Sequence, residues 1–343
     1  MATDTKKGAA LLRSMNANTK ASVVICAYTE KRWNYIQESV HSCLQQDPPS
    51  LEVILVIDHN PQLFQKSQEA FADMPTVSVM ENQEQQGLSG ARNPGVVTAK
   101  GDLIAFLDDD AIAEPDWLGR LVALCAPDDV MGAGARVEPA WETKHARWLP
   151  EEFYWVVGCS YRGQPQEIAP VRNPIGAAMV MKREGFDAVG TFKAGVGRVG
   201  EIPFGCEETE WCIRVSQKWP QTRFLYDPQA VVYHYVPSAR TTWSYFISRC
   251  YNEGLSKALL SYLVGTQDSL SSEQEYTLKV LPSGVLRGLR DGFFRLDPSG
   301  FGRAFAIVLG LGVTGFGYVT GLMKIKFSRN KAQSLASSTS SDN

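Results

Sequence analysis

The stretch Leu103-Ile104-Ala105-Phe106-Leu107-Asp108-Asp109-Asp110-Ala111 joins an apolar run of strand length to three consecutive carboxylates. A continuous hydrophobic run of this length is typical of a parallel strand that is buried on both faces. Ligands of open α/β sheets collect at the carboxyl ends of such strands, which is where the three Asp side chains would lie. The stretch therefore predicts an α/β fold with a binding site at the rim of its sheet.

The three carboxylates would repel one another unless a positive charge lay among them. A divalent cation such as Mg²⁺ or Mn²⁺ is the economical candidate, because both ions take oxygen ligands. Asp108 and Asp110 are two residues apart on an extended backbone and project to the same side, whereas Asp109 projects away. We therefore expect Asp108 and Asp110 to hold a metal ion. The alternative is a solvated acidic turn whose Asp residues cap a helix.

Length and composition set the outer limits of the fold. A chain of 343 residues that is 44% hydrophobic can bury one large α/β core and an appendage. Its net charge of −3 gives no support for a nucleic-acid surface. The seven Cys residues are scattered, which indicates reduced thiols in a cytosolic compartment rather than zinc ligands or disulfides. Residues 1–20 are polar, show no apolar core of a signal peptide and are predicted to be disordered.

Apolar runs alternate with helix-like segments in the first third of the chain. Buried strands are predicted at 23–28, 53–57, 77–80 and 103–107, and helices at 33–46, 61–72, 88–99 and 116–125. This alternation is typical of a doubly wound, mostly parallel sheet. Beyond residue 130 the pattern is less regular, with strands expected at 131–139, 177–181, 223–226 and 231–235 and helices at 207–217 and 242–264.

Five short motifs follow one another along residues 21–240. They are Val23 to Glu30 with its turn, Asp58 at the tip of the second strand, Gly87-Leu88-Ser89-Gly90-Ala91-Arg92-Asn93, Asp108-Asp109-Asp110, and the segment from Glu207 to Arg214. In this order they resemble the family-2 inverting glycosyltransferases of the GT-A fold. The resemblance implies a GT-A domain over 21–240 that uses a nucleotide sugar and a divalent metal ion.

The resemblance also implies which residues contact the nucleotide. Tyr28 and Glu30 would border the base, and Asp58 would accept the N3–H of a uracil. Arg92 and Asn93 belong to the segment that closes over the nucleotide in this family, where Arg92 would pair with phosphate oxygens. The alternatives are a strand-end cap for Asp58 and a surface position on a helix for Arg92.

For the metal, the resemblance implies a direct ligand at Asp110, with Asp108 nearer the ribose. His234 lies in Val231-Val232-Tyr233-His234-Tyr235, where the family often has a His close to the metal and the diphosphate. Imidazole is a common metal ligand, so we include His234 with Asp108 and Asp110 in the expected metal site. The alternative is a histidine that is hydrogen-bonded inside the core.

Glu207-Glu208-Thr209-Glu210 opens the predicted helix 207–217. Inversion by single displacement needs a carboxylate that removes the proton of the acceptor hydroxyl as the anomeric carbon is attacked. Glu208 matches the position of the family's catalytic base, which is usually Asp, and Glu207 is a substitute for that role. The alternative is a solvated helix start whose acidic residues interact favourably with the helix dipole.

Residues 304–323 contain no charge and are long enough to cross a bilayer. Arg and Lys residues stand on both sides of this segment, which does not fit a single crossing under the positive-inside rule. We therefore expect a membrane-associated or re-entrant helix at 303–325, preceded by an amphipathic helical region at 241–302 and followed by a disordered tail at 326–343. Gly317 and Gly321 would let another helix pack closely. The alternative is a buried core helix.

Together these expectations describe a membrane-associated inverting glycosyltransferase on the cytoplasmic face of the cell membrane. Its donor would be a nucleotide sugar, with a UDP-sugar favoured, its acceptor a lipid-linked glycan or a polysaccharide, and its cofactor Mg²⁺ or Mn²⁺. The competing interpretations are a membrane-anchored, non-catalytic carbohydrate-binding protein and a sugar nucleotidyltransferase. The latter needs a glycine-rich basic loop after the first strand, and residues 28–32 contain no glycine.

Overall fold

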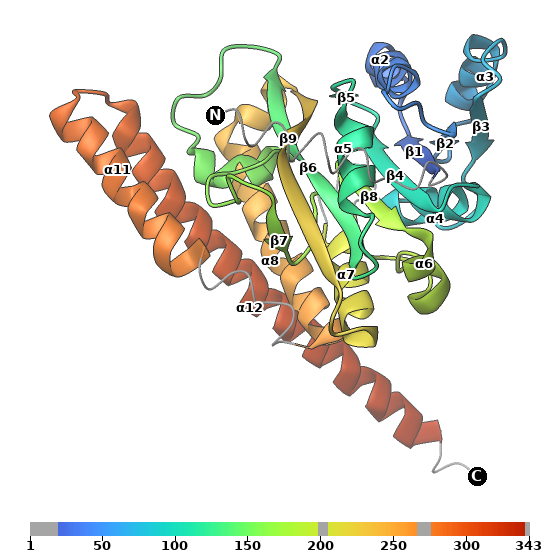
Figure 1. Ribbon diagram of the computed structural model, residues 1–343. Coiled ribbons are helices and arrows are strands. Elements are labelled where there is room, and N and C mark those ends of the chain that lie inside the picture. Colours follow the sequence, from blue (N-terminus) through green and yellow to red (C-terminus); the bar gives the residue numbers. More distant parts are fainter. Residues whose placement is uncertain (1–19, 198–204, 266–275, 340–343) are drawn as a thin grey trace.

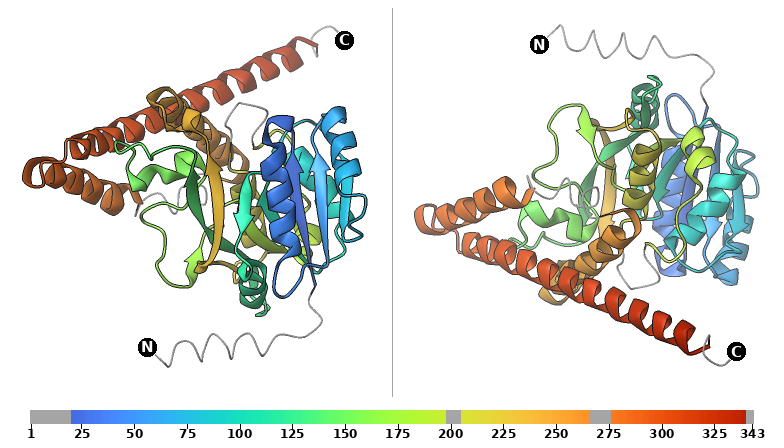
Figure 2. Two further views of the ribbon diagram at one scale, coloured as in Figure 1. Left: turned by 90° about the horizontal axis from the view of Figure 1, so that it is seen from above. Right: turned by 90° about the horizontal axis from the view of Figure 1, so that it is seen from below.

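The computed structural model describes residues 20–197, 205–265 and 276–339, and for residues 328–339 only the backbone. The described residues form an α/β body around a nine-stranded sheet, with a long helical hairpin along one side (Figure 1). The views in Figure 2 show the hairpin projecting beyond the body at both ends. The predicted disordered segment 1–20 lies outside the described residues except for Lys20.

Four adjacent strands form the parallel half of the sheet. In spatial order they are β3 (Val77–Glu81), β2 (Glu52–Ile57), β1 (Ala21–Ala27) and β4 (Leu103–Asp108). Every residue of β2 is buried, as expected for strands covered on both faces. The predicted α/β fold is confirmed, and the carboxyl ends of these strands meet at one edge of the sheet.

Helices cover both faces of the sheet because alternate strand residues point to opposite sides. Val23 and Ile25 pack into one core cluster and Val24 into another. The first cluster is covered by α2 (Trp33–Leu44), α3 (Pro61–Ala70) and α5 (Trp117–Leu124). The second is covered by α4 (Leu88–Thr98), α6 (Arg183–Val189) and α7 (Glu207–Lys218).

The other half of the sheet is mixed rather than parallel. β8 (Ala178–Lys182) runs antiparallel to both β4 and β6 (Val130–Trp141). β9 (Arg223–Val236) runs parallel to β6, while β5 (Ala111–Ala113) and β7 (Ala169–Val171) pair antiparallel with β9. The two strands predicted at 223–226 and 231–235 are therefore one strand. It looked interrupted because its register with β6 shifts where Asp227 and Pro228 fall, and proline has no N–H to donate to a ladder.

Three helices make up the rest of the described chain after the sheet. α8 (Trp243–Val264) packs against α12 (Ser299–Thr339), and α11 (Leu281–Phe294) forms the hairpin with α12. Short 3₁₀ or π turns occur at Glu30–Arg32, Glu151–Val157, Ser238–Thr241 and Tyr276–Val280.

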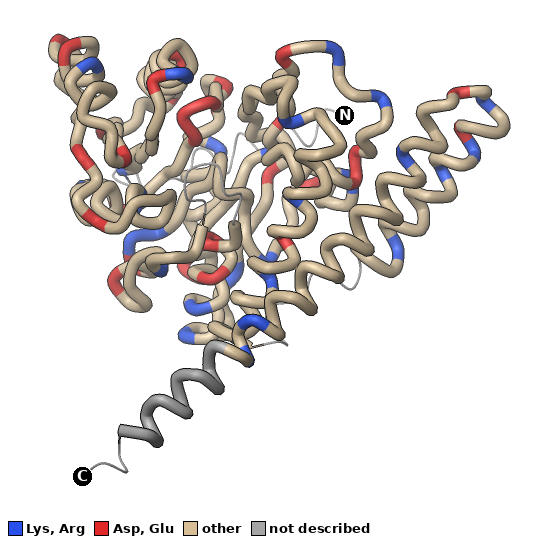
Figure 3. Tube along the Cα trace, turned by 180° about the vertical axis from the view of Figure 1, so that it is seen from behind, with Lys and Arg blue, Asp and Glu red and all other residues tan. Residues whose placement is uncertain are grey.

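α12 is long and apolar enough to cross a membrane over Ser299–Phe327. Only 28% of its most apolar stretch is buried, so it is not the buried core helix considered from the sequence. Figure 3 shows that its middle carries neither acidic nor basic residues. Its backbone stays helical to Thr339, past the predicted boundary at 325, where helix-favouring Leu, Met, Lys, Arg, Ala and Gln together make up more than half of the residues from Leu322 to Thr339.

Several of the cations around this segment pair with carboxylates of the protein. Arg303 lies 3.1 Å from both Asp291 and Asp297, and Arg295 lies 3.4 Å from Asp291. Arg287 pairs with Glu152. These ion pairs reduce the positive charge that the hairpin could offer to an anionic lipid surface.

Glycines let α8 and α12 approach each other closely. A Cβ atom added at Gly254 would collide with the backbone at Thr314 and Gly317, and one added at Gly321 would lie 2.5 Å from the Cβ of Ala258. The predicted packing face of Gly317 and Gly321 is thus occupied by α8. Such backbone-to-backbone contact excludes even a methyl group unless the helices separate.

Replacing Gly254 by Ala is expected to lower stability by about 2 kcal/mol or more, because the added methyl group meets backbone that cannot rotate away. Gly312 is the matched control, since a Cβ there meets no atom within 4 Å. Gly312→Ala should be neutral or stabilising by up to about 1 kcal/mol through helix propensity. Thermal unfolding of the full chain in detergent measures both, and equal effects would contradict the packing.

Candidate active site

A short strand brings His234 beside the three Asp residues. β5 follows Asp110 directly and pairs with β9 so that Ala111 lies opposite His234. The backbone N–H of Tyr235 donates to the carbonyl of Asp110 at 2.8 Å. As a result, His234 Nε2 lies 3.1 Å from Asp110 Oδ1 and 3.9 Å from Asp108 Oδ2.

One ligand atom each from Asp108, Asp110 and His234 lie within 4.8 Å of one another. Two carboxylates and an imidazole suit a divalent cation, and Mn²⁺ accepts the nitrogen ligand more readily than Mg²⁺. Asp110 Oδ1 and Asp108 Oδ2 both lie beside His234 Nε2, so these oxygen and nitrogen donors converge on one position. The residues present therefore fit the predicted metal ion.

Two arginines that the sequence reasoning missed flank this cluster. Arg32 Nη1 lies 3.1 Å from Asp110 Oδ2, and Arg240 Nη2 lies 3.8 Å from it. Burial alone would raise the pKa of Asp110, but His234 and these two cations outweigh burial and hold that pKa well below its usual range. Asp110 therefore stays ionised and ready to coordinate a cation.

Asp109 pairs with Arg32 rather than joining its neighbours in the metal-binding group. Arg32 donates to Asp109 Oδ1 at 2.7 Å, and Asp109 is not part of the group that could hold a metal ion. Burial raises the pKa of Asp109 to about 6 against the attraction of Arg32. The predicted division of the tripeptide, with Asp108 and Asp110 on one side, is thus what the structure has.

The two glutamates at the start of α7 differ in their surroundings. Arg92 donates to Glu207 Oε1 at 2.9 Å and to the carbonyl of Gly176 at 2.8 Å, and it lies 3.5 Å from Asp108. Glu208 lines a cavity and is partly buried. Burial first, and repulsion from Glu207 second, raise the pKa of Glu208 to about 8. Glu207 thus has a cationic partner, whereas Glu208 has a raised pKa and lines the cavity.

Glu208 lines a cavity of about 620 Å³ together with Asp108 and His234 of the metal-binding group, whereas Asp110 of that group is buried and does not line it. Asp108 and His234 line it from the sheet, and Arg92 and Glu208 line it from the helices. Gly176 borders it too, and a Cβ there would lie 3.3 Å from the Arg92 guanidinium, a tight contact, and 3.6 Å from Glu208 Oε2, an ordinary one. The space in which a sugar could be transferred therefore lies between Asp108 and Glu208.

The residues predicted to contact the nucleotide, apart from Arg92 and Asp108, do not line this cavity. Tyr28 and Glu30 follow β1, and Asp58 follows β2, at the same edge of the sheet. Asp58 accepts hydrogen bonds from Asn82 Nδ2 at 2.7 Å and from the N–H of Gly87 at 3.0 Å. Asn93 holds the loop at Phe192, donating to its carbonyl and accepting from its N–H, both at 3.0 Å.

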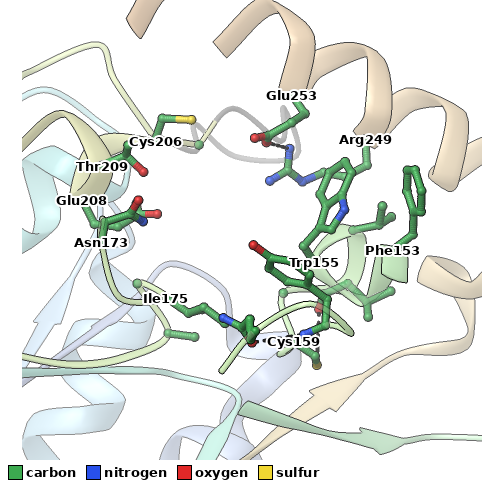
Figure 4. Close-up of a pocket in the computed structure, with 18 of the residues that line it drawn as sticks. Phe153, Trp155, Cys159, Asn173, Ile175, Cys206, Glu208, Thr209, Arg249 and Glu253 are labelled. Carbon is green, nitrogen blue, oxygen red and sulfur yellow. Dashed lines mark hydrogen bonds and ion pairs between the residues drawn. The ribbon is translucent and has the colours of Figure 1, made fainter. Parts of the chain in front are cut away.

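The aromatic residues near 150 divide between the cavity and the core. Phe153 and Trp155 line the cavity (Figure 4). Trp148 instead stacks on Trp243, with ring centroids 3.8 Å apart, and Trp141 packs against Tyr154. The cavity is also lined by Arg249, Glu253 and Lys257 of α8, which nothing in the local sequence pattern marked as functional.

A mixed α/β sheet with an Asp-x-Asp cation site at its carboxyl edge, facing an acidic helix start across a cavity, is the arrangement of GT-A glycosyltransferases. Comparison with known proteins agrees. Residues 22–190 match the family described as "Glycosyl transferase family 2". Over 308 residues the chain is 33% identical to the glucosyl-dolichyl phosphate glucuronosyltransferase of Haloferax volcanii, covering 89% of this chain and 96% of that relative.

Two solved structures have similar folds at 17% sequence identity. A mannosyltransferase from Pyrobaculum calidifontis, in complex with GDP-Man and Mn²⁺, has a TM-score of 0.55 and is covered over 93% of its length by 91% of this chain. GalNAc-T7 with UDP, GalNAc and Mn²⁺ has a TM-score of 0.50, with coverage of 58% of that chain and 78% of this one. The chain therefore belongs to glycosyltransferase family 2 and is a glycosyltransferase, so the non-catalytic and nucleotidyltransferase interpretations are set aside.

Proposed function

We propose that this glycosyltransferase transfers a sugar, with inversion, from a nucleoside-diphosphate sugar to a hydroxyl group of a lipid-linked glycan. One observation carries the proposal. Asp108 and His234 of the metal-binding group line the same cavity as Glu208, a glutamate whose pKa is raised, and this cavity is large enough for a sugar. A polysaccharide acceptor would use the same chemistry, so the lipid-linked form rests on further observations given below.

Glu208 is the proposed catalytic base. It takes the proton of the acceptor hydroxyl as that oxygen bonds to the anomeric carbon, while the bond from that carbon to the diphosphate oxygen breaks and its electron pair leaves with the nucleoside diphosphate. A raised pKa makes Glu208 a better proton acceptor than an exposed carboxylate. Glu207 is already paired with Arg92, and we assign it the positioning of that arginine rather than proton transfer.

The donor is proposed to lie between Asp58 and the metal-binding group, with a UDP-sugar favoured. Tyr28, Glu30 and Asp58 stand at the edge of the sheet where a base would bind. Arg92, at 3.5 Å from Asp108, is placed to meet the diphosphate. A divalent cation held by Asp108, Asp110 and His234, either Mg²⁺ or Mn²⁺, would stabilise the charge of the leaving diphosphate.

A lipid-linked acceptor at a membrane is supported by two observations, and we propose the cytoplasmic face as the side on which the enzyme acts. α12 exposes a long apolar surface that suits a membrane, and Leu311 and Thr314 of the same helix line the cavity. The Haloferax volcanii relative is named for a glucosyl-dolichyl phosphate. An acceptor anchored in the bilayer would thus reach Glu208 from the side where α12 lies.

The test is a panel of UDP- and GDP-sugars incubated with the purified full-length protein in detergent, with Mn²⁺, Mg²⁺ or EDTA. We expect one donor to release its nucleoside diphosphate only when a divalent ion is present. Transfer to a prenyl-phosphate-linked glucose should give a product whose anomeric configuration, measured by NMR, is opposite to that of the donor. The protein should sediment with membranes when cells are broken without detergent.

Each part of the proposal has its own contrary result. Nucleotide release that persists in EDTA would contradict the role of the metal ion. A product that keeps the anomeric configuration of the donor would contradict a single displacement with Glu208 as the base. Consumption of no donor under any divalent ion would contradict the choice of nucleotide sugars. Recovery wholly in the soluble fraction would contradict the membrane location and leave the chemistry standing.

A further inference from the structure

α8 has two rows of residues, here called stripes, and the four-residue spacing in each row keeps its members on one face of the helix. The first stripe packs toward α12 and consists of Phe246, Cys250, Gly254 and Ala258. The second, here called the polar stripe, lines the cavity and consists of Tyr245, Arg249, Glu253 and Lys257. One helix therefore connects the membrane-candidate helix to the interior of the active-site cavity.

The polar stripe carries an excess of positive charge. Arg249 Nη1 lies 2.9 Å from Glu253 Oε2, and Lys257 Nζ lies 3.4 Å from Glu253 Oε1. Within the polar stripe itself, two cations pair with one carboxylate, and all three side chains are at most 17% exposed. Charged groups withdrawn from water in this way attract an anion more strongly than they would at the surface.

Arg249 is held in a fixed orientation. Its guanidinium carbon lies 5.6 Å from the centroid of the Trp155 ring, which favours a cation above the ring face. Figure 4 shows Arg249 and Glu253 on the wall of the cavity opposite Glu208 and Asn173. The guanidinium therefore faces the cavity without being free to fold back into solvent.

The polar stripe is distinct from the cations near the metal-binding group. Arg92 pairs with Glu207, and Arg240 lies near Asp110, so both belong to the side where the donor diphosphate would bind. The polar stripe lies near α12, whose Leu311 and Thr314 line the same cavity. A molecule with one anionic group and an apolar chain would match this combination of surfaces.

We propose that the polar stripe of α8 binds the phosphate group of a lipid-linked acceptor, with Arg249 and Lys257 as its ligands and the hydrocarbon chain leaving along α12. The phosphate would keep the acceptor on the wall opposite Glu208, so that a sugar carried on it projects across the cavity toward the base. Charge-assisted hydrogen bonds from a guanidinium and an ammonium group suit phosphate oxygens. This inference rests on the proposed function and adds the recognition of the acceptor.

The test is equilibrium binding of radiolabelled geranylgeranyl phosphate to the full-length protein in detergent, with geranylgeraniol and inorganic phosphate as competitors. Geranylgeraniol has the same chain without the phosphate, and we expect it to bind at least about tenfold more weakly. Arg249→Gln and Lys257→Gln should each weaken binding of the phosphate about tenfold and leave binding of geranylgeraniol unchanged. Inorganic phosphate should compete poorly, because it lacks the chain.

Glu253→Gln should change the affinity for geranylgeranyl phosphate in the opposite direction, which distinguishes an effect on phosphate recognition from an effect on folding. Removing this carboxylate leaves both cations in place and should tighten binding of geranylgeranyl phosphate, whereas damage to the fold would weaken it. Arg290→Gln is the matched control, since Arg290 is exposed on α11 and does not line the cavity. Its affinity for geranylgeranyl phosphate should equal that of the wild type.

Three results would overturn the inference. The first is equal affinity for geranylgeranyl phosphate and geranylgeraniol, and the second is a loss of affinity for geranylgeranyl phosphate in Arg290→Gln as large as in Arg249→Gln. The third is loss of UDP binding rather than lipid binding in Arg249→Gln, which would place the stripe in the donor site. Metal-dependent release of the donor nucleotide, measured on the same preparation, reports on the proposed function separately. If that release occurs without a preference for the phosphate, only the present inference fails.

Discussion

Replacing Asp110 by Asn should lower the transfer rate by at least about 10³-fold, which is about 4 kcal/mol of transition-state stabilisation. The reason is that Asp110 is buried, stays ionised, and faces both His234 and Asp108 within the reach of one cation. Asn keeps the shape but supplies a neutral ligand to a cation that prefers carboxylate oxygens. The affinity for Mn²⁺ in the presence of UDP, measured by calorimetry, should fall in parallel.

Asp109→Asn is the control, because it changes the neighbouring residue in the same way. Asp109 is not one of the three grouped ligands and pairs with Arg32, which also contacts Asp110, so its replacement should change Mn²⁺ affinity by no more than about tenfold, less than Asp110→Asn does. Thermal unfolding of both variants separates a lost ligand from a lost fold. A larger loss of Mn²⁺ affinity in Asp109→Asn than in Asp110→Asn would mean that the ligands are assigned to the wrong residues.

The parallel half of the fold could be predicted because its signal is local. Each buried strand, such as β2 or β4, is a continuous apolar run that ends in a polar residue. The carboxyl ends of parallel strands meet at one edge, so Asp58 and Asp108 could be placed together without any knowledge of pairing. The mixed half could not be derived in this way, because the antiparallel place of β8 between β4 and β6 depends on contacts distant in sequence.

The metal-binding group shows the same limit at the level of single residues. Asp108 and Asp110 are fixed by the alternation of an extended backbone, but His234 reaches them through the pairing of β5 with β9. Only the family resemblance pointed to it. The sequence did not indicate that Arg32 and Arg240 lie at this site, because a single arginine in a turn is common. Both contact Asp110 only through the tertiary fold.

The role of the polar stripe of α8 could not be predicted from the sequence for a different reason. Residues 242–264 were predicted as an amphipathic helix, and Arg249, Glu253 and Lys257 at four-residue spacing look like the solvated face of such a helix. In the structure that face borders a cavity, since α12 and the 3₁₀ segment Glu151–Val157 stand around it. A sequence pattern gives the face of a helix but not what lies opposite it.

Replacing Glu208 by Gln should lower kcat by about 10³-fold while the KM for the donor changes little, because the base acts on the acceptor proton only as the new bond forms. Glu207→Gln is the matched control one residue away. It leaves Arg92 without its charged partner, so its main effect should be a higher KM for the donor rather than a comparable loss of kcat. Near-normal turnover in Glu208→Gln together with a large loss in Glu207→Gln would move the base by one residue.

The pH dependence provides an independent check of the same assignment. Glu208 is a carboxyl group whose pKa is raised to about 8, so it is mostly protonated below that pH and ionised above it. A base must be ionised, and kcat/KM should therefore rise with pH, reach half its maximum near pH 8 and level off about one pH unit above that. The groups that act on it are Glu207, Arg92 and Glu253, from three different helices. Glu253→Gln removes a negative charge and should shift the rise to lower pH, whereas in Glu208→Gln the residual rate should not rise at all through this range.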